Sequence, residues 1–185
     1  MSRQDWLNTS KEYSKPIYRA FTQEQKIAFW QEKISEVLML NWNESEIEHI
    51  TKLKDFIDKH KYLFSGKKLG NEDLNTLDLF FYEWKEYAIE KLGWTTKICI
   101  AIAGSGYKVA NRNGDIEYIT SNNTRSSVAP GPSLGDIPEC DCNLDNDFCG
   151  SVAGPCSKSN CEDTAHGCGW LLAQVCNGEC SIAIP

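Results

Sequence analysis

The chain has 185 residues, a formal net charge of -7 and nine cysteines. This length suits one ordinary domain, or one domain with a small module attached. Proteins that bind nucleic acid present basic surfaces, so the acidic balance argues against nucleic acid as a partner. It also argues against direct adsorption to anionic lipid. No stretch approaches the roughly 20 apolar residues that a membrane-spanning helix needs.

Charge and cysteines are both unevenly distributed along the chain. Residues 1–135 carry 18 acidic and 18 basic side chains, whereas residues 136–185 carry eight acidic and one basic. Eight cysteines lie between Cys140 and Cys180, and only Cys99 lies earlier. Such a density of cysteine is typical of small disulfide-stabilised units. The sequence therefore predicts two parts of different character.

Residues 1–20 show no clear hydrophobic periodicity, so we expect an extended or poorly ordered lead-in. This start is polar and mixed in charge, which is not typical of a secretory signal. If the protein is exported, either a leader was removed before residue 1 or a dedicated transporter is used.

Three amphipathic helices are predicted next. A capping box beginning at Thr22 opens a helix near 22–40, and a second one at Asn43 opens a helix near 44–62. A third apolar stripe at helical spacing follows, and Gly93 ends it. Short connections between these helices favour a small bundle, which we take as the N-terminal domain, residues 1–94.

The pattern changes after this bundle. The run TTKICIAIA, residues 95–103, is β-branched and apolar and favours a strand. Asn113-Gly114 lies between two apolar segments and predicts a hairpin with a type I′ turn. We therefore expect two or three short strands over residues 95–120.

Residues 121–138 are rich in Ser, Asn, Gly and Pro and are typical of an exposed linker. Arg125 and the small residues Ser127, Val128 and Ala129 would be accessible to a protease there. The predicted fold is thus α+β: a helical bundle, a short β extension, the linker, and a disulfide-rich module over residues 139–185.

The cysteines of the module admit two interpretations, four disulfides or two four-thiolate zinc sites. Zinc modules usually present C-x2-C pairs, and this segment has none, so disulfides are favoured. A segment this short needs such cross-links because its own core is small. The spacing does not reveal the connectivity. The cysteines expected to pair are Cys140, Cys142, Cys149, Cys156, Cys161, Cys168, Cys176 and Cys180.

Cys99 lies in an apolar run, so we expect a buried free thiol rather than a disulfide partner for the module.

The order of these cysteines resembles the fulvocin C family of cysteine-rich bacteriocins. The matching elements are the opening C-x-C, the Asp147-Phe148-Cys149 step, the step Gly167-Cys168-Gly169 beside Trp170, and the closing cysteine pair. The resemblance covers roughly residues 140–180. It implies a secreted antibacterial polypeptide that acts on the membrane of a target bacterium.

The apolar run that begins Trp170-Leu171-Leu172 has two interpretations. Trp and Leu suit an interfacial anchor, so these residues are candidates for contact with a target. Alternatively they form a mini-core around the disulfides, for which the other candidates are Phe148, Val152, Ile182 and Ile184. We favour this second interpretation. Because the module is acidic, a protein or glycan receptor is a better target than bare lipid.

Metal binding and catalysis have little support. Glu139, Asp141, Asp145 and Asp147 lack the glycine and distal glutamate of a calcium loop, so we expect a solvated acidic loop. Three histidines are present. His49 and His60 are expected at solvent faces or helix ends, and His166 adjoins a cysteine that is no nucleophile once it forms a disulfide. We expect no enzyme activity, no metal and no cofactor.

The favoured function is therefore a secreted, bacteriocin-like precursor with the module as effector. The alternative is a non-toxic secreted or surface protein with structural or interaction roles, and an enzyme or metal protein ranks third. Residues 1–135 would be a leader, an immunity or chaperone domain, or a structural body.

Overall fold

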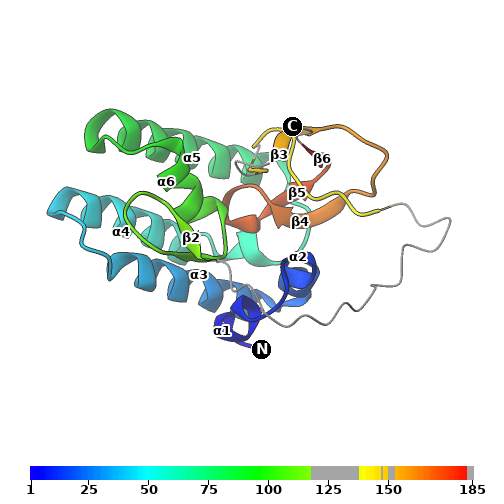
Figure 1. Cartoon of the computed structure of the whole chain (residues 1–185), viewed down its shortest axis with the longest axis horizontal. Coiled ribbons are helices and arrows are strands. Elements are labelled where there is room, and N and C mark those ends of the chain that lie inside the picture. Colours follow the sequence, from blue (N-terminus) through cyan, green and yellow to red (C-terminus); the bar gives the residue numbers. More distant parts are fainter. Residues whose placement is uncertain (118–137, 147, 150–152, 183–185) are drawn as a thin grey trace.

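Three long helices form the body of the protein in the computed structural model, which describes residues 1–117, 138–146, 148–149 and 153–182. They are α3 (Gln23–Leu38), α4 (Glu44–Lys59) and α5 (Asn71–Leu92), and a 3-10 turn, η1 (Lys61–Phe64), follows α4. They confirm the predicted bundle (Figure 1). Among the described residues, no helix is long and apolar enough to cross a membrane.

Local capping signals explain where these helices begin and end. The Thr22 and Asn43 side chains accept hydrogen bonds from the backbone N–H groups of Gln25 and Glu46, as the two capping boxes predict. α5 ends at Gly93. Each boundary depends on residues that are close in sequence, which is why the sequence alone located them.

The expectation of a poorly ordered lead-in is wrong. Residues 1–20 form α1 (Arg3–Leu7) and α2 (Lys11–Ala20), and Trp6 and Tyr18 are almost completely buried. Trp6 Nε1 donates to the backbone carbonyl of Ser14 at 2.6 Å, which ties the two helices together. Burial of these large aromatic side chains against the body stabilises helices whose own periodicity is weak.

The expectation of a strand at 95–103 is also wrong. This segment forms α6 (Thr96–Cys99) and a π-helical turn, η2 (Ile100–Gly104). Most of its side chains are buried, and a short apolar run buried on all sides has no periodicity to separate helix from strand. The fully buried Lys33 of α3 holds η2 in place, since its Nζ donates to the carbonyls of Ala101, at 2.9 Å, and Tyr107. Burial holds the pKa of Lys33 well below its usual range.

The hairpin is confirmed, but its turn type is not. β1 (Lys108–Val109) pairs antiparallel with β2 (Ile116–Glu117). Gly114 has a φ of 75° and its N–H donates to the carbonyl of Asn111 at 3.2 Å, but Asn113 does not have the positive φ that a type I′ turn requires. The linker and its protease-accessible residues fall almost entirely outside the described residues.

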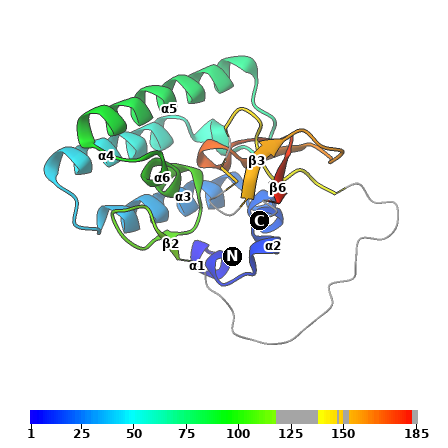
Figure 2. The ribbon, with the colours of Figure 1, turned by 45° about the horizontal axis from the view of Figure 1, so that its top comes forward.

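The cysteine-rich module contains two further antiparallel pairs. β3 (Ala153–Ser157) pairs with β6 (Glu179–Ile182), and β4 (Thr164–Cys168) pairs with β5 (Gln174–Cys176). A short turn, η3 (Trp170–Leu172), connects β4 to β5. The module lies at one end of the body, next to α2 (Figures 1 and 2).

One hydrophobic core runs through the body and into the module. The buried side chains of Trp170, Leu171, Leu172 and Ala173 belong to the same cluster as those of the helices. A second, separate cluster consists of cysteines alone, namely Cys140, Cys168 and Cys176, with Cys161 packed against it. The overall class is α+β with a disulfide-rich C-terminal module, as predicted.

Candidate functional site: the docked cysteine-rich module

All eight cysteines of the module form disulfides, which confirms the expectation from composition. The paired Cα atoms lie between 5.0 and 5.9 Å apart. The pairs are Cys140–Cys161, Cys142–Cys156, Cys149–Cys180 and Cys168–Cys176. Cys99 is free and buried, also as expected, and burial raises the pKa of its thiol to about 12.

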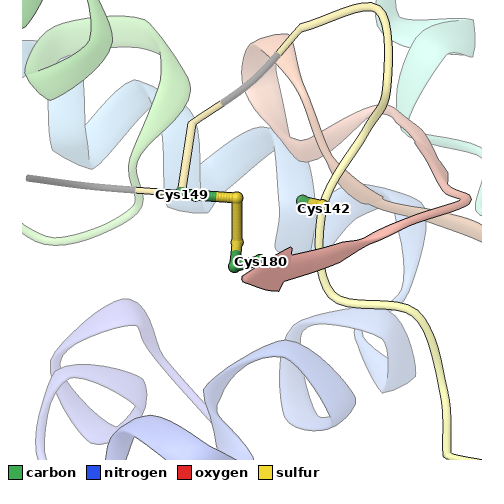
Figure 3. Close-up of side chains that lie close together, drawn as sticks. All are labelled: Cys142, Cys149 and Cys180. Carbon is green, nitrogen blue, oxygen red and sulfur yellow. A yellow bond between two sulfur atoms is a disulfide. The ribbon is translucent and has the colours of Figure 1, made fainter. Parts of the chain in front are cut away.

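Two of these disulfides come close together. The Sγ atoms of Cys142, Cys149 and Cys180 all lie within 4.8 Å of one another, and Figure 3 shows Cys142 beside the Cys149–Cys180 bond. All three sulfurs are in disulfides, with Cys156 as the partner of Cys142. A disulfide sulfur is not a thiolate, so this cluster would bind a metal ion only after reduction.

The acidic side chains of the predicted loop make separate contacts and do not come together as ligands of one calcium ion. Glu139 pairs with Arg19, and Asp141 Oδ1 accepts the backbone N–H of Cys180 at 2.9 Å. Among the described residues, the Cys142 group is the only set of three or more ligand side chains this close together. Asp147 lies outside the described residues.

The side chains proposed as a target contact are buried inside the protein. Trp170, Leu171 and Leu172 are 5%, 0% and 7% exposed. The Trp170 ring stacks on Phe81 of α5, with centroids 4.5 Å apart, and Phe148 packs edge-on against it at 4.7 Å. In the docked protein the three residues are therefore not exposed, and they form a core with the helices rather than the expected mini-core around the disulfides.

The backbone of this contact adopts an uncommon conformation. Leu171 and Leu172 have φ values of 54° and 51°, in the left-handed region that L-residues with side chains seldom adopt. Each such residue costs about 1–2 kcal/mol, so other contacts must hold the turn in place. The most direct is the Tyr18 hydroxyl, which donates to the carbonyl of Leu171 at 3.2 Å and accepts from Trp30 Nε1 at 3.0 Å.

A buried amide joins the turn to α5. Gln174 Oε1 accepts the backbone N–H of Trp170 at 3.0 Å and the side-chain amide of Asn146 at 3.1 Å. Its Nε2 donates to Asp78 Oδ1 at 3.0 Å. Burial, followed by the nearby charge of Asp145, raises the pKa of Asp78. One side chain of the module thus fixes both its own turn and its position on the body.

Basic side chains of α2 face the acidic module. The helix carries three basic residues and one acidic residue. Lys15 Nζ donates to the carbonyl of Asp141, and Arg19 forms an ion pair with Glu139. The overall neutrality of residues 1–135 therefore hides a local charge match. Sequence reasoning missed it because it treated residues 1–20 as unstructured.

Lys26 and His166 meet across the same interface. Nζ of Lys26, on α3, lies 2.9 Å from Nε2 of His166, on β4. The two residues are only 2% and 9% exposed. Burial is the main reason why the pKa values of both side chains are lowered, that of His166 to about 4. Neither residue was singled out from the sequence as part of an interface.

The other two histidines lie in the body. His60 caps the end of α4, as expected. His49 is 2% exposed and stacks on Trp84 and Tyr87, with centroids 4.8 and 5.1 Å away, so the expectation that it faces solvent is wrong. Its position four residues before the apolar Leu53 was the sequence signal for burial. Burial lowers the pKa of His49 to about 4.

Four disulfides in a short acidic module are consistent with a secreted, disulfide-stabilised protein. No family model, curated protein or solved structure matches this chain. Function is therefore inferred from the residues and from how they are arranged.

Proposed function

We propose that this protein is a secreted bacteriocin-like precursor in which the helical body keeps an effector module docked and covered. The observation that carries the proposal is the burial of Trp170, Leu171 and Leu172 against the body. These are the side chains of the module best suited to a membrane interface or an apolar receptor. A precursor has to keep such a surface covered until the effector is released.

The cysteine pattern supports the effector role. Its order resembles that of fulvocin C and its relatives, and four disulfides would keep the module rigid outside the cell. The separate hydrophobic cluster of the module consists of cysteines and does not include Trp170. A released module would therefore expose Trp170 to its surroundings. Its seven acidic side chains repel anionic lipid, which favours a protein or glycan receptor on the target bacterium. We propose no catalytic activity and no nucleic-acid partner for the chain.

The alternative is a non-toxic secreted or surface protein. The continuity of one core through the body and the module favours it, because such a core stabilises a single permanent unit. In that case the burial of Trp170 is structural, and the module is never released.

A growth-inhibition assay separates the two functions. A recognition site for a specific protease is placed within residues 121–138, and the oxidised chain is tested intact and after cleavage on a panel of bacteria. The oxidised 136–185 segment is tested alongside. Inhibition by the cleaved chain or the segment, but not by the intact chain, is the result expected of a covered effector.

Two other results would count against the proposal. If neither the cleaved chain nor the segment inhibits any strain, the structural alternative is favoured. If the intact chain inhibits as strongly as the cleaved chain, the body does not cover the effector. Reduced and alkylated cleaved chain is the matched control, since loss of the disulfides should abolish inhibition.

A further inference from the structure

The Lys26–His166 contact is an unusual way to join two parts of a protein. Both side chains are basic, both are more than nine-tenths buried, and their nitrogen atoms lie 2.9 Å apart. Buried basic groups normally face a carboxylate. Here they face each other, one from the body and one from the module.

The chemistry of the two groups fixes how they bond. An ammonium group has only N–H donors, so Lys26 donates to the lone pair of His166 Nε2. The imidazole is then neutral and carries its proton on Nδ1. If the imidazole takes up a second proton, both ring nitrogens become donors and the bond to Lys26 is lost. Two like charges then face each other in a site that is almost completely buried.

The surroundings disfavour this extra charge. The backbone of Arg19 raises the pKa of His166, but burial and the Lys26 cation act more strongly and lower it. The charged groups that act on the ring are Lys26 of α3 and Arg19 of α2, both cationic, and Arg19 is already paired with Glu139. Tyr18 contributes a neutral phenol from α2, and its ring centroid lies 6.5 Å from that of His166. Gly66 closes the site, since a Cβ there would lie 3.1 Å from Lys26 Nζ and 3.5 Å from His166 Cε1. Among the described residues, His166 Nδ1 has no hydrogen-bond partner.

We propose that Lys26 and His166 form an acid-sensitive latch that releases the cysteine-rich module from the helical body when the imidazole is protonated. Release would break the contact of Tyr18 with Leu171 and expose Trp170, while relaxing the left-handed backbone of the η3 turn. Release of the module by acid goes beyond the proposed function, because it does not require antibacterial activity. Undocking can be measured without any target cell.

The direction of the pH dependence follows from the two states of the histidine. A solvated imidazole has a pKa near 6.5, whereas burial, Lys26 and Arg19 lower the pKa of docked His166 to about 4. Between these values the undocked state binds the additional proton, so docking weakens as the pH falls from about 6.5 to about 4. The ratio of docked to undocked molecules should change by at most about 300-fold over this range.

Amide hydrogen exchange on the intact oxidised chain measures this ratio even when opening is rare. The probes are the backbone N–H groups of Trp170 and Ala173, which are hydrogen-bonded to Gln174 and to the carbonyl of Trp170. Protection factors, corrected for the intrinsic pH dependence of exchange, are compared at pH 7 and pH 4. We expect protection of these amides to fall by up to about 300-fold, and protection in the interior of α5 to fall less.

Three variants test the role of the pair. His166→Gln should lose most of the pH dependence at Trp170 and Ala173, whereas His60→Gln, outside the interface, should behave like the parent. Lys26→Met, which removes one cation but keeps the imidazole, should shift the loss of protection to a different pH. Protection within α5 at pH 7 shows that each variant is folded.

Three results would overturn the latch. Protection at Trp170 and Ala173 could stay constant between pH 7 and pH 4. It could fall equally in His166→Gln, or it could fall in step with protection inside α5. The last result would mean that acid unfolds the whole protein, for instance through His49, and does not undock the module.

Discussion

Trp170 of the module lies flat on Phe81 of α5, with ring centroids 4.5 Å apart and planes within 4° of parallel. The two residues come from parts of the chain that differ sharply in charge and cysteine content. Their contact places the largest apolar side chain of the module in the core of the body. The module is therefore docked by hydrophobic burial, and the polar contacts around this stack set its orientation.

Gly169 should be the glycine in the docked turn that is least tolerant of substitution. Its φ is 66°, and an added Cβ would lie 1.8 Å from Gln174 Oε1. Displacing Gln174 would leave the Trp170 N–H without its acceptor. We expect Gly169→Ala to lower the free energy of unfolding by roughly 3 kcal/mol, from backbone strain and the lost hydrogen bonds together.

Gly93→Ala is the matched control for this prediction. Gly93 has a similar φ of 68°, but no atom lies within 4 Å of the added Cβ. Its cost should be only about 1 kcal/mol, from the backbone alone. Equal losses for the two variants in urea unfolding would mean that Gln174 does not occupy the position seen beside Gly169.

Burial of His49 should make the helical body sensitive to acid. Its pKa is about 4 in the folded protein and near 6.5 when unfolded, so the unfolded chain binds more protons between these values. Stability is therefore lost as the pH falls from about 6.5 towards about 4. His49→Phe should reduce the loss in unfolding free energy between pH 7 and pH 4.5 by about 2–3 kcal/mol.

His60→Phe serves as the control in the same urea titrations. His60 also lies beside aromatic rings, those of Phe56 and Tyr62, but it is only partly buried at the end of α4. The unfolding free energy of this variant should depend on pH in the same way as that of the parent. If His49→Phe also leaves it unchanged, the imidazole of His49 is not buried in the folded body.

The state of the nine cysteines can be read by alkylation and intact mass. The folded chain should take up no alkyl group, because eight thiols are in disulfides and Cys99 is buried with a pKa of about 12. The denatured chain without reductant should take up one, and the reduced denatured chain nine. Module thiols that react without reductant, or metal mass in native spectra, would instead indicate a reduced metal site.

Local signals in the sequence were enough for the helices of the body. The Thr22 and Asn43 caps and Gly93 fix helix ends through neighbours three to five residues away. The same kind of box at Ser2, with Asp5, begins α1, but the short helix and Pro16 inside α2 obscured the pattern. The cysteine count likewise predicted the disulfides but not their pairing.

The docking contact could not be predicted in this way. Nothing near Trp170 in the sequence indicates that Phe81 will be its partner, and an apolar run buried on all sides fits several structures. The net charges of the two parts were also misleading. The positive charge of α2 is cancelled by acidic side chains elsewhere in residues 1–135, so the net charge of this segment does not reveal it. Contacts between distant segments depend on the complete fold, which the sequence pattern alone does not supply.

A double-mutant cycle on Phe81 and Trp170 tests most directly whether the module is docked on the body. Phe81→Leu, Trp170→Leu and the double variant are compared with the parent in urea unfolding, and Tyr82→Leu, exposed on the same helix, replaces Phe81→Leu in a control cycle. We predict a coupling free energy of about 0.5–1.5 kcal/mol for Phe81 with Trp170, and one near zero for Tyr82 with Trp170. Equal and negligible coupling in both cycles would contradict the docked arrangement.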